Sequence, residues 1–310
     1  MHEGTDATKS MDGPSALALA AVVVANVALA FGPWFVREAD TGPVAAAFWR
    51  MALSLPFIAA IAWRAGARPA AMDRSLWWLL VASGVAFAAD LAAWHLGIRR
   101  TTLANSTLFG NTATLLFPLY GFLVARAWPT RRQGAAFALA LVGGALLMGR
   151  SLDVDPRRLT GDLLCVLAGI LYTVYFIVMT RVRGSMRAFS SLTLSTAASM
   201  GPLLLFAWAL GERVWPDTWA PLIGLALASQ VVGQGCMVYA LGKLSPLVVG
   251  LALLVQPVVS ATLGWIVYDE RLGPVDLAGA ALVASALVMV ARARVAEPSV
   301  RAHLVTEEAR

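Results

Sequence analysis

Charged side chains are scarce in this chain. Asp, Glu, Lys and Arg make up 14% of its 310 residues, whereas hydrophobic residues make up 59%, and the mean hydropathy is +0.72. So few polar groups cannot cover the surface of a water-soluble globule of this length. The composition therefore excludes an ordinary soluble domain and indicates that most of the chain lies in a lipid bilayer.

The residue types that usually carry catalysis and metal binding are also few. The chain has two cysteines and three histidines, and it contains no HExxH, GxSxG or Walker-type motif and no paired Cys/His ligand set. We therefore expect a protein that is not an enzyme and that uses no metal or cofactor. Cys165 and Cys236 lie inside apolar stretches and are interpreted as small apolar residues. The only lysines, Lys9 and Lys243, are not placed mid-span, which argues against a retinal-type photoreceptor.

Long apolar stretches account for most of the sequence. A helix of about 20 residues crosses the hydrocarbon core of a bilayer, and these stretches have about that length. The alternating pattern of a membrane β-barrel is absent, and the stretches are too long for barrel strands of about 10 residues. The sequence therefore predicts an all-α integral membrane protein with ten transmembrane helices, at 15–36, 43–63, 76–98, 103–124, 132–149, 161–180, 191–210, 218–241, 246–268 and 275–290.

The lysines and arginines are distributed unequally between the two ends of these spans. Ten spans place both termini on one side, and that side holds 15 of the 24 Lys and Arg residues, the other side eight, while Arg50 lies within a span. Loops that remain in the cytoplasm keep positive charge, so we expect cytoplasmic termini and the inner membrane of a bacterium. The pI of 9.9 then reflects charge facing anionic headgroups, and we expect no nucleic-acid partner.

The second half of the sequence repeats features of the first at an offset of about 143 residues. Residues 97–102, Gly-Ile-Arg-Arg-Thr-Thr, align with residues 240–245, Ala-Leu-Gly-Lys-Leu-Ser. Each half contains five spans, an odd number, so the second half must enter the membrane from the opposite side. This arrangement predicts two inverted repeats around a central cavity, which divides the chain into 1–14 (cytoplasmic tail), 15–150 (first repeat), 151–292 (second repeat) and 293–310 (cytoplasmic tail).

Short motifs in the second half resemble a known transporter family. They are Ala-Leu-Gly-Lys-Leu-Ser-Pro at 240–246, Gln256-Pro257, Leu263-Gly264-Trp265 and Asp269-Glu270-Arg271-Leu272. Through them the chain resembles, over about residues 14–292, the ten-helix EamA-type branch of the drug/metabolite transporter superfamily. The first half departs from this pattern, with Ala113-Thr114 in place of Gln-Pro and Ala127-Trp128 in place of Glu-Arg.

The resemblance implies a secondary transporter that moves small organic metabolites by alternating access through a cavity between the repeats. The spans implied to line it are 15–36, 76–98, 103–124, 161–180, 218–241 and 246–268. Among family members we favour the exporters of neutral or aromatic amino acids or related compounds. Proton-coupled multidrug efflux and a non-transporting membrane sensor or assembly subunit are the alternatives. The protein is expected to act as a monomer or a homodimer.

Asp90 is the one carboxylate deep inside a predicted span. It shares a helix face with Phe87 and Trp94. A charged carboxylate in lipid is costly unless it faces a cavity or a partner, so we expect Asp90 to line the cavity. Two roles remain open for it: exchange of a proton for substrate, or binding of the substrate's ammonium group. His95, nearer the outer end of the span, is a second candidate for proton coupling or an ordinary interfacial histidine.

Amide and aromatic side chains dominate the other polar positions of the expected lining. Such a pocket suits neutral or zwitterionic solutes that combine an apolar body with a few hydrogen bonds. The residues expected to bind substrate are Asp90, Phe87, Trp94, Asn26, Asn111, Tyr172, Tyr175, Gln230, Gln234, Tyr239 and Gln256. Arg50 is expected either to bind a substrate carboxylate or to extend toward the outer headgroups. A phosphate-bearing substrate would need several cations, and Arg50 is the only one available.

Overall fold

The described part of the chain is helical almost throughout. The computed structural model describes residues 16–67, 72–126, 128–149, 155–268 and 273–291. The expected tails 1–14 and 293–310 and the motif residues 269–272 lie outside these ranges. Within them the chain forms ten rods: α1 (Ala16–Ala30) with α2 (Gly32–Glu38), α3 (Pro43–Arg64), α4 (Arg74–Ile98), α5 (Leu103–Gly110) with α6 (Ala113–Ala125), α7 (Arg131–Gly149), η1 (Pro156–Arg158) with α8 (Leu159–Ser185), α9 (Ala188–Ala209), α10 (Ala220–Gly224) with η2 (Leu225–Gln234) and α11 (Gly235–Leu241), α12 (Pro246–Ala252) with α13 (Val255–Tyr268), and α14 (Pro274–Ala291).

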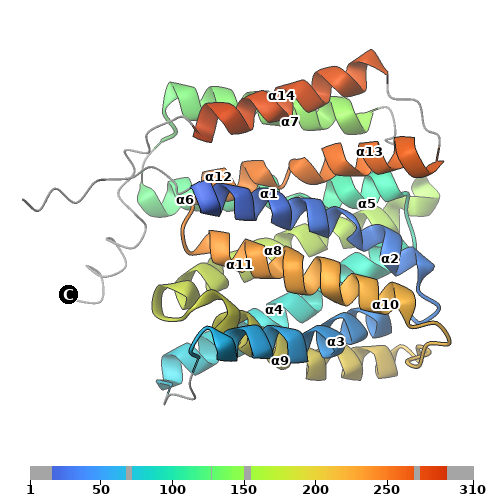
Figure 1. The fold of residues 1–310 in the computed structure, drawn as a ribbon. Coiled ribbons are helices and arrows are strands. Elements are labelled where there is room, and N and C mark those ends of the chain that lie inside the picture. Colours follow the sequence, from blue (N-terminus) through green and yellow to red (C-terminus); the bar gives the residue numbers. More distant parts are fainter. Residues whose placement is uncertain (1–15, 68–71, 127, 150–154, 269–272, 292–310) are drawn as a thin grey trace, which may run out of the picture.

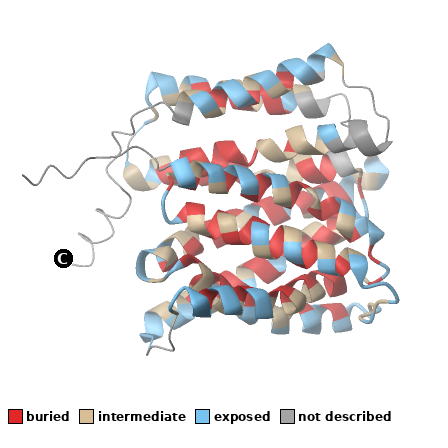
Figure 2. Cartoon of the chain, viewed as in Figure 1, coloured by how far each residue is buried: buried red, intermediate tan, exposed pale blue. Residues whose placement is uncertain are grey.

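Most of these rods have the length and apolar character of membrane spans. Seven of the described helical segments are long and apolar enough to cross a bilayer, and two shorter apolar segments, Pro246–Ser260 and Leu277–Met289, belong to the ninth and tenth rods. Buried residues face the interior of the bundle, while many outward faces carry exposed large hydrophobic residues such as Leu123 and Leu205 (Figure 2). An apolar exterior of this kind is stable where lipid is the solvent. The prediction of an all-α membrane protein is confirmed.

The packing of the rods repeats between the two halves of the chain. α4, in the third rod, packs on α8, in the sixth rod. The rods equivalent to these in the other half are the eighth and the first, and there α1 packs on η2 and α11. The contact of α4 with α9 likewise corresponds to that of α3 with η2. Three further pairs join equivalent rods: α3 with α9, α6 with α12, and α7 with α14. Because each half has five rods, equivalent rods run in opposite directions, and the repeats are related by an axis in the membrane plane.

The direction of the rods places the start of α1 and the end of α14 at the same end of the bundle (Figure 1). α2, α5 and α13 lie toward the other end. α7 and α14 pack mainly against each other along one edge. The close approach there needs glycine, because a Cβ at Gly143 would lie 2.7 Å from the carbonyl oxygen of Gly279.

Several central rods are irregular. The fourth rod breaks at Asn111 and Thr112, between α5 and α6, and the equivalent ninth rod breaks at Leu253 and Leu254. Pro257 accounts for the second break, since a proline disturbs the carbonyl four residues before it, which here belongs to Leu253. The eighth rod contains η2, a ten-residue π-helix in which hydrogen-bonded residues lie five apart.

Candidate functional site

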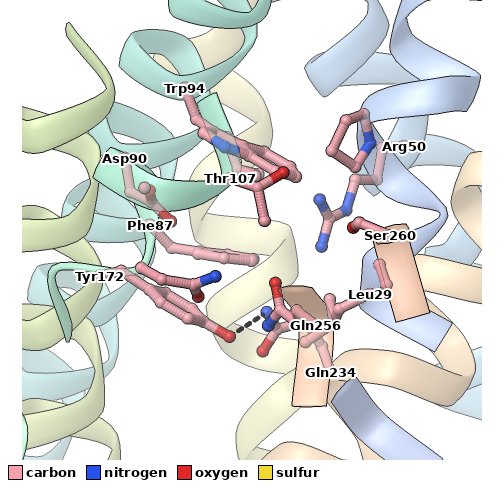
Figure 3. A pocket seen from close by; sticks show the side chains of 15 residues that line it. Leu29, Arg50, Phe87, Asp90, Trp94, Thr107, Tyr172, Gln234, Gln256 and Ser260 are labelled. Carbon is pink, nitrogen blue, oxygen red and sulfur yellow. Dashed lines mark hydrogen bonds between the residues drawn. The ribbon is translucent and has the colours of Figure 1, made fainter. Parts of the chain in front are cut away.

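A cavity lies among the central rods (Figure 3). Its lining includes Pro33 of α2 and Gly110 of α5, two helices that lie toward the end of the bundle opposite to the start of α1 and the end of α14 (Figure 1). Its empty volume is about 550 Å³, open solvent included. All six spans implied to line it contribute residues, and α3 adds one more. The lining consists of Leu29, Ala30, Pro33, Arg50, Phe87, Asp90, Leu91, Trp94, Thr107, Gly110, Asn111, Tyr172, Gln234, Gln256 and Ser260. Arg50 and Asp90 are the only charged residues in this described lining.

The other end of the bundle is closed by tight packing between the fourth and ninth rods. α6 packs extensively on α12, whereas the equivalent contact of α5 with α13 is slight. At the closed end a Cβ on Gly121 would lie 2.8 Å from Cβ of Pro246, and Gly250 lies against Pro118. These glycines let the two rods approach closely there. The cavity is therefore separated from the end of the bundle at which α1 begins and α14 ends.

One face of α4 forms a wall of the cavity. Phe87, Asp90, Leu91 and Trp94 are spaced at three and four residues and so share one side of the helix. Asp90 is 7% exposed, and no hydrogen-bond donor to its carboxylate is found among the described residues. The aromatic wall is completed by Tyr172 of α8, whose ring stacks on that of Phe87 at a centroid distance of 6.4 Å.

Arg50 enters the cavity from α3, opposite α4 (Figure 3). It is 1% exposed; its Nε donates to Oε1 of Gln230 at 3.0 Å, and one terminal nitrogen donates to the carbonyl oxygen of Ser229 at 3.4 Å. Gln230 is held in turn by a 3.1 Å bond from its Nε2 to Oγ1 of Thr196. Of the two expectations for Arg50, extension toward the headgroups is wrong, because its guanidinium is hydrogen-bonded inside the bundle to Gln230 and Ser229 of the π-helix.

Amide and hydroxyl groups form the polar remainder of the lining. Gln234 donates from Nε2 to the hydroxyl of Tyr172 at 2.9 Å, the bond drawn in Figure 3, and its Oε1 is buried without a described partner. Gln256 donates from Nε2 to Oδ1 of Asn26 at 2.8 Å. Asn111 reaches the cavity at the break between α5 and α6. The site thus offers amides, the hydroxyls of Thr107, Tyr172 and Ser260, and an aromatic surface around two charges.

The structure brings together seven of the residues expected to bind substrate, namely Phe87, Asp90, Trp94, Asn111, Tyr172, Gln234 and Gln256. The other four lie behind the lining or away from it. Asn26 supports Gln256, and Gln230 supports Arg50. Tyr175 is fully buried and stacks on Phe87 at 4.4 Å. Tyr239 lies near the closed end, where its ring is 5.8 Å from Nζ of Lys243.

His95 does not fit the expectation of an interfacial histidine. Its side chain is fully buried, with Nδ1 2.9 Å from the carbonyl oxygen of Pro43, and it does not line the cavity. Thr107 and Ser260 line the cavity although the sequence did not predict them as site residues, whereas Arg50 lines it in agreement with the first of its two expectations. Arg50 stood out in the sequence because it is the one arginine deep inside a predicted span. Among the described residues there is no group of three or more His, Cys, Asp or Glu that could hold a metal ion.

Comparison with known proteins gives concordant results. The sequence pattern of the EamA-like transporter family matches the chain twice, at residues 16–149 and 159–292. An uncharacterized transporter of Archaeoglobus fulgidus is 24% identical over 245 residues, which cover 76% of this chain and 82% of that protein. A solved structure, described only as the crystal structure of a protein, is 14% identical; it superposes with a TM-score of 0.71 and covers 88% of this chain and 95% of its own. That likeness shows the shared fold.

Proposed function

Because the chain belongs to the EamA-like transporter family, we propose that it exports neutral or aromatic amino acids, or related compounds, by alternating access. The observation that carries this proposal is the central cavity, where aromatic rings and amides surround a site closed toward one end of the bundle. Such a lining suits a solute with an apolar body and a few hydrogen-bonding groups. The transporter class follows from the family; the substrate and the direction are our proposal.

The two repeats supply a route for alternating access. We take 15–150 and 151–292 as the repeating units, between which the cavity lies. Inverted repeats can exchange their conformations, so the tight contact of α6 with α12 can loosen as that of α5 with α13 forms. The distribution of positive charge supports cytoplasmic termini in a bacterial inner membrane, and the cavity then faces away from the cytoplasm.

Counterflow in proteoliposomes tests this function. Vesicles loaded with an unlabelled neutral or aromatic amino acid should take up the same labelled compound faster than protein-free vesicles do. An imposed pH gradient, applied in a parallel series, reports whether accumulation is coupled to protons. Uptake of cationic drugs without amino-acid exchange would favour multidrug efflux instead. Absence of exchange for every solute tested would favour a sensor or assembly subunit.

A further inference from the structure

Two opposite charges face the same cavity without forming an ion pair. Arg50 and Asp90 lie on opposite sides of it in Figure 3, on α3 and α4, and both are almost fully buried. The only ion pair found among described residues is that between Arg213 and Asp217, on the surface. Buried opposite charges in a membrane protein usually pair with each other, since each is otherwise costly to desolvate. Here both remain available to a third group.

Each charge also has unused hydrogen-bonding capacity directed at the cavity. A guanidinium has five N–H donors, and the bonds to Gln230 and Ser229 use two of those on Arg50. A carboxylate accepts several hydrogen bonds, and that of Asp90 has no donor among the described residues. The guanidinium carbon lies 5.8 Å from the centroid of the Phe87 ring, which is part of the cavity wall. The cavity therefore presents one cationic donor set and one anionic acceptor.

A zwitterion is the ligand that satisfies both groups at once. Its carboxylate can accept the free N–H groups of Arg50, and its ammonium can donate to Asp90, in charge-assisted hydrogen bonds. A dianion would leave Asp90 opposed by like charge, and a dication would do the same to Arg50. The rings of Phe87, Trp94 and Tyr172 leave an apolar wall for a side chain.

We propose that Arg50 and Asp90 together recognise the α-carboxylate and α-ammonium groups of a zwitterionic amino acid. The inference rests on the proposed function, in that it takes the cavity as the transport site. It assigns Asp90 to substrate recognition and leaves proton exchange as the competing role. It also identifies Gln230 as a positioning residue, because it orients the guanidinium without reaching the cavity.

The test uses competition in counterflow by the full-length protein. The labelled probe is L-phenylalanine or L-leucine, whichever exchanges faster. The competitors are its N-acetyl derivative, which lacks the ammonium, and its amide, which lacks the carboxylate. In the parent both should compete about 10- to 100-fold more weakly than the amino acid, as loss of one charge-assisted hydrogen bond predicts. Equal competition by either derivative overturns the inference while leaving the transport function intact.

Variants make the assignment specific. In Asp90→Asn, the N-acetyl derivative should compete about as well as the amino acid, while the amide should still compete more weakly. In Arg50→Gln, the amide should compete about as well as the amino acid, while the N-acetyl derivative should still compete more weakly. Arg64→Gln and Asp73→Asn are matched controls on or beside the same helices; both residues are exposed, and Asn at position 73 can still cap α4, so both variants should behave as the parent. Arg50→Lys is the second variant if Arg50→Gln does not fold, since it keeps the charge but loses the planar fork.

Three other outcomes would overturn either the recognition of a zwitterion or the transport function. If Asp90→Asn keeps both discriminations but loses accumulation driven by a pH gradient, Asp90 serves proton exchange and the inference is wrong. Exchange of another neutral solute, with neither amino acid exchanged, overturns the inference but not transport. A parent protein that exchanges no solute at all overturns the proposed function itself.

Discussion

Gln256 of α13 donates a 2.8 Å hydrogen bond to Asn26 of α1, so a residue that lines the cavity is fixed by one from the other repeat. Replacing both by apolar residues of similar shape, Asn26→Leu and Gln256→Met, should show a coupling of about 0.5 to 1.5 kcal/mol in a double-mutant cycle. Thermal unfolding in detergent measures it. Asn26→Leu paired with Gln133→Met, in the exposed first turn of α7, should show additive effects. Additivity in the Asn26 and Gln256 pair as well would contradict the role given to this bond.

Thr196 is expected to act on the site through Gln230. Thr196→Val removes the hydroxyl that accepts the Gln230 amide, so the guanidinium of Arg50 loses its fixed orientation. The half-saturation constant for amino-acid exchange should rise about 3- to 10-fold, with little change in maximal rate. Thr193→Val on the same helix is the control, because that hydroxyl bonds only to the Phe189 carbonyl oxygen. A fall in maximal rate alone would argue against a positioning role.

Gly84 marks a close crossing of α4 and α9. A Cβ there would lie 2.8 Å from the Ser195 carbonyl oxygen, which cannot easily move, so Gly84→Ala should destabilise the fold by about 1 to 3 kcal/mol. Gly201→Ala on α9 meets nothing within 4 Å and should instead stabilise it by about 0.5 to 1 kcal/mol. Thermal unfolding of the two variants side by side checks both signs. Equal effects would mean that the crossing is looser than the structure indicates.

Glu212 links a surface loop to the start of α3 and should make stability depend on pH. Its carboxylate accepts from the Ala45 amide at 2.8 Å, and burial raises its pKa above the ordinary 4.5, against the opposing effect of backbone hydrogen bonds from Ala45 and Val44. The folded protein therefore binds this proton more tightly than the unfolded chain, and stability rises as the pH falls from neutral toward 4.5.

Glu212→Gln should remove that dependence. Its amide oxygen can still accept from Ala45, so the variant should melt at a higher temperature than the parent at pH 7, and the difference should shrink near pH 4.5. Melting curves across this range measure the effect. Asp73→Asn, which alters an exposed carboxylate, should leave the pH dependence in place. A difference that grows as the pH falls would reverse the sign assigned to Glu212.

Accessibility to a water-soluble thiol reagent should separate cavity residues from buried ones. In a background with Cys165→Ala and Cys236→Ala, Ser260→Cys should be labelled, and the transported amino acid should protect it, because Ser260 lines the cavity. Ser199→Cys should stay unlabelled, since Ser199 is fully buried and its hydroxyl bonds within α9. Labelling at position 199, or none at position 260, would mean that the cavity lies elsewhere.

The number and kind of elements followed from the sequence because they depend on local quantities. Hydropathy over about 20 residues defines a membrane span whatever its neighbours are. The inverted repeat followed from the offset between 97–102 and 240–245 together with an odd count of spans. Asp90 was found in the same way, since a carboxylate within an apolar span stands out without any knowledge of packing.

The tertiary structure alone decided which side chains meet in the cavity. Arg50 could point inward or toward headgroups as far as its own helix is concerned; its bond to Gln230, 180 residues away, settles the direction. Tyr172 lines the site while Tyr175 lies behind it, because the rotation of α8 is set by its packing on α4. The π-helix at 225–234 was equally hidden, since hydropathy is the same whether helical hydrogen bonds span four residues or five. Local composition fixes the spans, whereas the rotation of each span depends on partners far away in the chain.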